Sequence, residues 1–345
     1  MIFASMLVRL ASQASNTNIW LDILQFVVAF LSFFGFVLTS AVILILAERK
    51  IMAYMQDRVG PVHTGPWGLL QTVADVGKLL LKEDIHAAQT DKALFILAPS
   101  VFLAPVIAAF AVLPLSPYVG VPGTALATGI VYYVALSSID VVGIVMAGWS
   151  SNNKYSLIGG LRSAAQMISY ELPLVLALVG VVMLTSILAN TGLGTISIRD
   201  IMTYQATSVY PGRGVGFWDF VFQGFTPWAW FFLQQPLMII IYYVCGLAET
   251  NRAPFDLPEA EQELTAGYLT EFSGLRWSLY QMAEYINMIT VSAVAATLFF
   301  GGWSLFGLGL ENIPGLSIII FLIKVAFFLF LFIWLRATLP RIRYD

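Results

Sequence analysis

The sequence contains very little charge. Charged residues make up 11% of its 345 residues, whereas hydrophobic residues make up 59%. Soluble domains have about 25% charged residues, so this composition excludes a water-soluble globular protein. The net charge is only −3 and the basic residues are scattered, which argues against a nucleic-acid-binding protein. The composition instead indicates a protein whose solvent is the lipid bilayer.

Metal-binding residues are also scarce. Cys245 is the only cysteine, so the chain can form no intrachain disulfide and has no set of thiolates for an iron–sulfur cluster or a structural zinc. The histidines, His63 and His86, have no partner ligand at the spacing of a metal site. We therefore expect this chain to bind no metal and no redox cofactor, so any redox centre must belong to another chain.

Long apolar runs are abundant and define the fold class. A helix of roughly 20 apolar residues crosses the bilayer, and strands of a membrane barrel would be shorter and alternating. The sequence predicts an all-α, polytopic transmembrane helical bundle in a single integral domain, residues 1–345. The expected spans, about seven in number, lie near residues 20–47, 93–115, 124–148, 167–189, 229–248, 279–301 and 315–336.

Basic residues are concentrated on one side of the predicted spans. Loops 48–92, 149–166 and 249–278, together with the C-terminal tail, hold most of the Lys and Arg residues. Because loops rich in Lys and Arg stay in the cytoplasm, these loops are predicted to be cytoplasmic. The protein is expected in the cell (inner) membrane, with residues 1–19 as an N-terminal extension on the other side.

The loop after the fifth predicted span carries an unusual number of carboxylates. Asp256 and Glu259 have the spacing of a helix N-cap and its capping partner. On such a helix, Glu263 would share a face with both of them, and this crowding of like charges is unfavourable. Partial burial and mutual repulsion would raise the pKa values of these carboxylates toward neutrality, so that they could exchange protons. A simple helix start and a proton-exchanging site are both compatible with the pattern.

Arg252 lies within the same loop. It follows Glu249 by three residues and precedes Asp256 by four, so it could pair with either carboxylate. The pair could be a local ion pair, or it could shift these carboxylates when a ligand binds nearby.

Four ionisable residues lie within the predicted spans themselves. Asp140, Glu171, Glu284 and Lys324 are costly inside a bilayer and are expected to face the bundle interior or a water-filled path. Glu171 and Glu284 could instead reach the membrane surface, because they are placed near span ends.

The first charged loop contains an amphipathic stretch, LLQTVADVGKLLLKE, whose apolar residues recur at helical spacing. This pattern predicts a helix along the membrane surface, and it is compatible with a functional role. The loop and its flanks carry charged residues at Glu48, Arg49, Asp57, Arg58, Asp75, Lys78, Lys82 and Glu83.

Taken together, these charged segments resemble the H-subunit family of proton-pumping NADH-quinone oxidoreductase, respiratory complex I. The resemblance covers about residue 47 to the last residue. The matching stretches are AERKIMAYMQDRVGP, GLLQTVADVGKLLLKED, GWSSNNKYSLIGGLRSAAQMISYELPL, AETNRAPFDLPEAEQELTAGYLTEFSG, MAEYINM and KVAFFLFLFIWLRATLPRIRYD.

The resemblance implies a membrane subunit that forms much of the cavity for ubiquinone or menaquinone and begins a path for proton transport. It implies FMN and iron–sulfur clusters in partner subunits, with quinone as substrate and none of these cofactors bound here. The expected quinone-cavity residues are Glu48, Arg49, Arg58, Asp75, Lys78, Glu249, Arg252, Asp256, Glu259, Glu261 and Glu263. The expected proton-path residues are Asp140, Glu171, Glu284, Lys324 and Arg336.

The chain departs from the family in its third span. Some members have a glutamate where this chain has Ser137 and Ser138, and Asp140 lies close by. Two other functions remain open. A membrane-bound hydrogenase or ferredoxin-linked complex uses a similar subunit, and a stand-alone cation/proton antiporter could use the charges within the spans. The sequence shows no internal repeat of the kind found in many transporters, which argues against the antiporter. A purely structural anchor would need none of the buried charges.

Overall fold

The computed structural model describes residues 19–85, 87–117, 124, 126–188, 194–207, 230–257, 265–305 and 314–342. Within these ranges every regular element is a helix, which confirms the all-α prediction. In chain order the elements are α2 (Ile19–Met55), η1 (Pro66–Gly68), α3 (Gln71–Leu81), α4 (Lys92–Phe110), α5 (Gly129–Ser150), α6 (Lys154–Leu188), α7 (Ile198–Thr207), α9 (Phe231–Gln234), α10 (Pro236–Glu249), η4 (Gly267–Leu269), α12 (Gly274–Phe299) and α13 (Pro314–Thr338).

In the described part of the chain, six helices are long and apolar enough to cross a membrane, and α10 is a shorter apolar helix. The prediction of about seven spans is therefore close. The six long helices are α2, α4, α5, α6, α12 and α13. The chain is a multi-pass membrane protein.

Several predicted boundaries were wrong because helices continue beyond the apolar residues. The first helix extends to Met55 and therefore includes the start of predicted loop 48–92. Most of predicted loop 149–166 belongs to α6, which begins at Lys154. Hydropathy indicates where a helix enters lipid, whereas a helix ends only where its backbone hydrogen bonds stop. Charged residues such as Arg162 do not interrupt these hydrogen bonds.

The fifth predicted span is broken. Its first turn, α9, ends at Gln234. Helix α10 then begins, with Pro236 as its first residue. The residue before a proline is disfavoured in the helical conformation, and Gln235 has non-helical backbone angles (φ −134°, ψ 62°), so a new helix starts at Pro236. This break leaves α10 with 14 residues, too short to be one of the six long helices.

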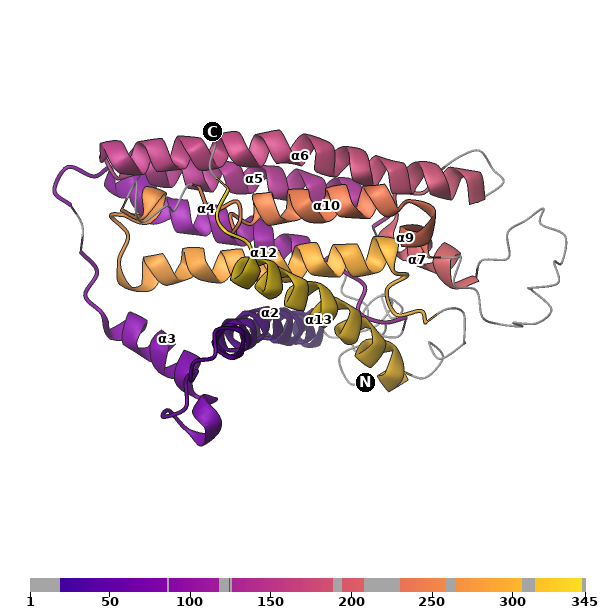
Figure 1. Cartoon of the computed structure of the whole chain (residues 1–345), viewed down its shortest axis with the longest axis horizontal. Helices are drawn as coiled ribbons and strands as arrows, with labels where there is room; N and C mark the ends of the chain where they lie inside the picture. Colours follow the sequence, from indigo (N-terminus) through magenta and orange to yellow (C-terminus); the bar gives the residue numbers. More distant parts are fainter. Residues whose placement is uncertain are drawn as a thin grey trace, which may run out of the picture.

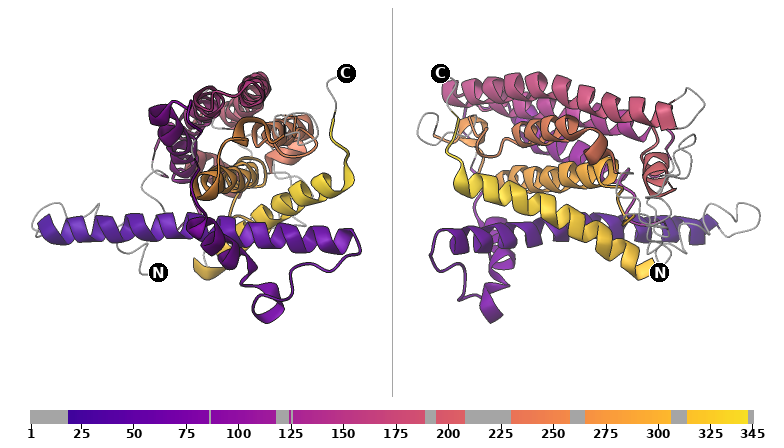
Figure 2. Two further views of the ribbon diagram at one scale, coloured as in Figure 1. Left: turned by 90° about the vertical axis from the view of Figure 1, so that its left-hand side faces the viewer. Right: turned by 45° about the vertical axis from the view of Figure 1, so that its right-hand side comes forward.

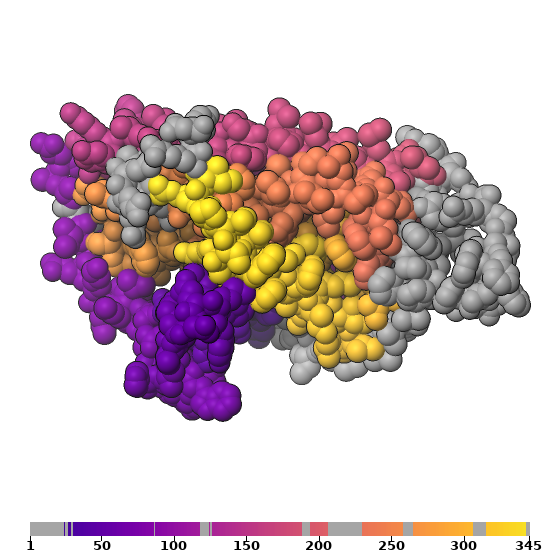
Figure 3. Space-filling view, in the orientation of Figure 1, coloured from indigo at the N-terminus to yellow at the C-terminus, as the bar shows by residue number. Residues whose placement is uncertain are grey.

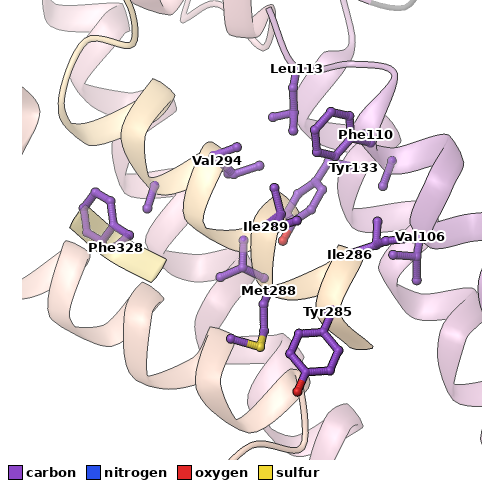
Figure 4. Packing of buried hydrophobic residues seen from close by; sticks show 14 of the residues in the cluster. Val106, Phe110, Leu113, Tyr133, Tyr285, Ile286, Met288, Ile289, Val294 and Phe328 are labelled. Atoms are coloured by element: carbon purple, nitrogen blue, oxygen red, sulfur yellow. The ribbon is translucent and has the colours of Figure 1, made fainter. Parts of the chain in front are cut away.

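Helix α12 is the centre of the bundle. It contacts α2, α4, α10 and α13 (Figure 1), and every residue from Ala283 to Phe299 is buried. Figure 4 shows Ile286 and Ile289 of α12 beside Val106 and Phe110 of α4. Because α12 meets so many neighbours, its polar side chains lie inside the protein.

Small residues allow some of these helices to approach closely. At Gly143 on α5, an added Cβ would lie 2.8 Å from backbone atoms of Phe102 on α4. The interface between α4 and α5 therefore has no room for a side chain at this position, as is typical of small residues at membrane helix interfaces.

The three charged connections meet at one end of the bundle. Helix α6 and the start of α12 reach this end together (Figure 1). Hydrogen bonds and ion pairs join the connections here. They are Asp91 N to Ser150 O at 3.1 Å, Asn153 Nδ2 to Glu271 Oε1 at 2.8 Å, Ser156 Oγ to Tyr268 O at 3.2 Å, and Arg276 Nη2 to Asp84 Oδ2 at 3.1 Å. The bundle therefore has one charged end.

The segment containing η1 and α3 protrudes from the helical body (Figures 1 and 3). The predicted amphipathic helix is present as Gln71–Leu81. Its polar side is held against α2, because Arg49 of α2 forms an ion pair with Asp75. Its apolar side chains Val73 and Leu80 are exposed. Figure 2 shows this segment projecting below the long helix α2.

Candidate functional site

A buried ion pair lies inside the charged end of the bundle. Arg252 Nη2 is 3.2 Å from Glu284 Oε2, and the two side chains are only 9% and 3% exposed. The hydroxyl of Tyr268 donates a hydrogen bond of 3.0 Å to the other oxygen of Glu284. The Arg252 guanidinium also lies 4.3 Å from the centre of the Tyr285 ring. Buried charges persist only when they are paired and hydrogen bonded, and this arrangement provides both.

The local sequence explains how these groups meet. Helix α10 ends at Glu249, so Arg252 lies in the turn that follows. The spacing of residues along a helix therefore does not determine where the Arg252 side chain points. Helix α12 begins at Gly274 and not near residue 279, so Glu284 lies almost three turns inside it. The alternative in which Glu284 reaches the membrane surface does not fit the structure, because its carboxylate is buried against Arg252. Within the described residues, the predicted partner Glu249 forms no ion pair.

A second ion pair joins the first and last described helices. Arg336 of α13 pairs with Glu48 of α2, whose side chain is only 4% exposed. Tyr285 interacts electrostatically with Glu48 and Arg336 as well as with Arg252. The structure therefore brings the predicted residues Glu48, Arg252, Glu284 and Arg336 into one network around Tyr285.

The other charges of the first loop lie at the surface. Arg49 pairs with Asp75, and Lys78 is exposed on α3. Arg58 donates from Nε to Gln56 at 2.7 Å. A half-open hollow of about 350 Å³ lies where the end of α2 meets η1, and it is lined by Lys50, Ala53, Tyr54, Arg58, Val59, Gly60, Pro61, Val62 and Trp67. Its walls combine aromatic and apolar side chains with cations.

Three further predicted carboxylates form an acidic cluster between α5, α6 and α10. Glu171 lies near the middle of α6 and accepts a hydrogen bond from Ser138 of α5. Asp140 and Glu249 are buried and interact electrostatically with each other. Glu249 also interacts with Glu171. The structure therefore brings these three predicted residues together, each from a different helix.

Lys324 of α13 lies apart from both groups. Its ammonium donates to the carbonyls of Phe300 at 2.7 Å and Gly302 at 2.9 Å, and to that of Ser304. It also lies 4.4 Å from the centre of the Trp230 ring. Phe300 follows Glu284 by 16 positions, which corresponds to about 24 Å of helix. Lys324 therefore caps the far end of α12.

The described part of the chain leaves out three predicted quinone-cavity residues, Glu259, Glu261 and Glu263, and also His86. Asp256 is half-buried near the end of a described segment. Sequence reasoning missed the tyrosines at 268 and 285, although Tyr285 follows Glu284 directly. A tyrosine beside an intramembrane carboxylate is a usable signal, because a buried hydroxyl needs a polar partner. No group of three or more metal-ligating side chains occurs among the residues that the structure describes.

The fold and this network define an integral membrane protein of the helical-bundle class with a charged, hydrogen-bonded interior at one end. Residues 26–345 match the family model described as NADH dehydrogenase. A protein of Brevibacillus brevis, named as the H subunit of NADH-quinone oxidoreductase, is 45% identical to this chain, over 94% of the chain and 87% of the relative. Relatives with that name from Protochlamydia amoebophila and Bacillus cytotoxicus are 44% and 42% identical, over 89% and 97% of this chain and 86% and 90% of their own lengths. The chain belongs to the H-subunit family of NADH-quinone oxidoreductase, which confirms the resemblance.

Proposed function

We propose that the chain is the membrane subunit of a proton-pumping NADH:quinone oxidoreductase that forms the cavity for quinone and the first acidic part of the proton path. The observation that carries this proposal is the Arg252–Glu284 ion pair. It is buried at the charged end of the bundle, and Tyr285 connects it to the Glu48–Arg336 pair. Family membership supports the proposal, since the relatives are named as parts of NADH-quinone oxidoreductases.

The end of α2 and the segment containing η1 and α3 provide a route for quinone. A quinone has an apolar tail and a polar head, and the hollow beside η1 offers Tyr54 and Trp67 together with Lys50 and Arg58. The exposed apolar side of α3 would lie in lipid or against a partner protein. The residues proposed to shape the quinone cavity remain Glu48, Arg49, Arg58, Asp75, Lys78, Glu249, Arg252, Asp256, Glu259, Glu261 and Glu263.

The Arg252–Glu284 pair can couple quinone chemistry to proton movement. Reduction of a quinone to a quinol takes up two electrons and two protons, and an anion formed on the way is stabilised by a nearby cation. A quinone anion that attracts Arg252 would weaken the ion pair between Arg252 and Glu284. A buried carboxylate that loses its counter-charge becomes costly to keep ionised, so Glu284 would take up a proton. Glu171, Asp140 and Arg336 are the neighbouring candidates for passing protons onward.

Other chains would complete the enzyme. This proposal assigns FMN and the iron–sulfur clusters to partner subunits of the peripheral arm, and this chain contributes its single integral domain to the membrane arm. The charged end of the bundle would face the cytoplasm, because that end carries the concentrated Lys and Arg residues. The membrane would be the cell (inner) membrane, where the complex serves the respiratory chain.

The proposal is tested by Glu284→Gln in the assembled complex. We expect inhibitor-sensitive NADH:quinone activity and vesicle acidification to fall together, because the amide cannot carry the charge that Arg252 requires. NADH oxidation by an artificial acceptor should stay normal, since that reaction uses only the peripheral arm. Glu83→Gln changes an exposed carboxylate of the first loop and serves as the matched control. Normal quinone reduction with normal pumping in Glu284→Gln would overturn the proposal.

A further inference from the structure

Helix α6 holds the turn that carries Arg252. The half-buried side chain of Gln166 on α6 reaches the last turn of α10 and the residues that follow it. Its amide nitrogen donates to the carbonyl oxygens of Ala248 at 2.8 Å and Phe255 at 2.9 Å, and to Oδ1 of Asn251 at 3.3 Å. One side chain therefore contacts the chain on both sides of Arg252.

The acceptors determine which end of the Gln166 amide faces the turn. Backbone carbonyl oxygens only accept hydrogen bonds, so the group facing Ala248 and Phe255 must be the NH2 group and not the amide oxygen. An NH2 group has two hydrogens, and the two carbonyls use both of them, while the longer contact with Asn251 shares one. Methionine has a similar length but no donor for these carbonyls.

The backbone of the turn is only weakly held at Arg252 itself. The Arg252 N–H donates to the Leu247 carbonyl over 3.4 Å, which is long for a backbone hydrogen bond. Asn251, the preceding residue, has a φ of +49°, in the left-handed region that few residue types other than glycine and asparagine adopt readily. The conformation of the turn therefore depends on contacts made by side chains.

Asn251 is held at both ends of its own side chain. Its Oδ1 accepts from Gln166, and its Nδ2 lies 3.9 Å from the sulfur of Met167. Gln166 and Met167 are neighbours on α6, and Asn251 is only 3% exposed. Because Asn251 directly precedes Arg252, these contacts fix the backbone from which the guanidinium projects.

Helix α6 also holds the other side of the Arg252–Glu284 ion pair. Ser156 precedes Gln166 by ten residues, or about 15 Å of helix, and donates to the Tyr268 carbonyl at 3.2 Å. The hydroxyl of Tyr268 in turn donates to Glu284 at 3.0 Å. Helix α6 runs along α10 to the charged end (Figure 1), so one helix supports the surroundings of both the cation and the carboxylate.

The ion pair needs an accurately placed cation. The Arg252 guanidinium must lie 3.2 Å from Glu284 and at the same time 4.3 Å from the centre of the Tyr285 ring. Arginine has a long side chain with many rotamers, so a shifted turn would allow one contact without the other. Displacing a functional group by about 1 Å can slow a reaction about 100-fold.

We propose that Gln166 is a positioning residue for the Arg252–Glu284 ion pair. Its amide closes the turn around Arg252 and so directs the guanidinium toward the carboxylate. The inference rests on the proposed function, in which Arg252 stabilises an anion formed during quinone reduction. Gln166 itself carries no charge and takes up no proton, and it acts through Arg252.

The first test is steady-state NADH:quinone kinetics of the assembled complex with Gln166→Met. The kcat should fall about threefold to tenfold, and the KM for quinone should stay unchanged, because Arg252 acts on the anion and not on the bound quinone. NADH oxidation by an artificial acceptor should stay normal.

Gln235→Met is the matched control. Gln235 is also half-buried, and it donates to a carbonyl of α6, that of Gly180, at 3.1 Å. Gly180 lies 14 residues beyond Gln166, or about 21 Å along α6, so this bond cannot influence the turn at Arg252. The control variant should keep kcat within about twofold of the unaltered complex.

A double variant distinguishes positioning from a general loss of stability. If Gln166 acts through Arg252, Gln166→Met should cost little in a complex that already carries Arg252→Lys, because lysine cannot make both guanidinium contacts. The double variant should then match Arg252→Lys within about twofold. A purely structural role would instead multiply the two losses.

Two results would overturn the inference, namely a normal kcat in Gln166→Met and losses that multiply in the double variant. If Gln166→Met fails to assemble, Gln166→Asn replaces it. Asparagine keeps the amide but is one methylene shorter and cannot reach both carbonyls, so a normal kcat there would also overturn the inference. Any of these results beside a Glu284→Gln complex that fails to pump would remove the role of Gln166 and leave the proposed function standing.

Discussion

Glu48 and Arg336 form an ion pair although 288 positions separate them in the sequence. The pair joins α2 to α13, and it places a buried carboxylate against a cation that is one-third exposed. It therefore closes the bundle at the same end at which Tyr285 contacts Arg252.

Arg336→Ala should destabilise the protein. The substitution leaves the Glu48 carboxylate buried without its cation, at a cost of roughly 1–3 kcal/mol. Differential scanning fluorimetry of the purified complex should show a lower unfolding temperature. Arg199→Ala removes an exposed arginine from α7 and should have little effect. If Glu48→Leu combined with Arg336→Leu is no more stable than Arg336→Leu alone, the ion pair is not the cause.

Arg252→Lys should reduce quinone reduction about tenfold or more, which corresponds to about 1.4 kcal/mol in the barrier. Lysine keeps the charge but cannot both stack on Tyr285 and pair with Glu284 as the planar guanidinium does. Steady-state NADH:quinone kinetics measure the loss. Tyr285→Phe keeps the ring beneath Arg252 and removes only the hydroxyl. This variant should therefore lose less quinone-reduction activity than Arg252→Lys. Equal activities for Arg252→Lys and the unaltered complex would contradict this account.

Lys324→Met should lower stability by roughly 1–3 kcal/mol, because the carbonyls at the end of α12 lose their buried donor. Thermal unfolding of the complex measures this change. Lys324→Arg keeps a cation and should restore part of the loss. If Lys324 instead acts in the proton path, Lys324→Met should lose proton pumping while the complex unfolds at the normal temperature.

Gly143→Ala should destabilise the α4–α5 contact by roughly 1–3 kcal/mol, because a methyl group there overlaps the Phe102 backbone. Gly35→Ala on α2 is the matched control, since nothing lies within 4 Å of its added Cβ. Comparing the unfolding temperatures of the two variants separates packing from the general effect of alanine in a helix. Equal unfolding temperatures would show that α4 and α5 do not approach as described.

Gentle purification from the native membrane should yield a large assembly that contains flavin, iron–sulfur signals and inhibitor-sensitive NADH:quinone activity. A chain that purifies alone and acidifies vesicles in response to a sodium or potassium gradient would instead support the antiporter. An assembly that accepts electrons from ferredoxin or hydrogen, and not from NADH, would support the related complexes.

Sequence patterns predicted the helical class and the approximate number of spans because both depend on local composition. The same patterns misplaced the start of α6, since hydropathy does not detect a helix that continues outside lipid. The partner of Arg252 could not be predicted either. Spacing along the chain suggested Glu249 or Asp256, but Arg252 lies in a turn, and its ion pair reaches a carboxylate on another helix. Contacts between distant segments depend on packing, which no local pattern contains.

The most buried span, α12, is also the least apolar of the six, with a mean hydropathy of 1.4 over 18 residues against 2.0 or more in the others. Lipid is therefore a poor solvent for α12 during synthesis, because its carboxylate Glu284 would lack the partners that Arg252 and Tyr268 provide in the folded protein. Helices α2 to α10 leave the ribosome first and can offer it a protein surface. Insertion of α12 into the membrane thus depends on neighbours that are already in place, and α13 covers it afterwards.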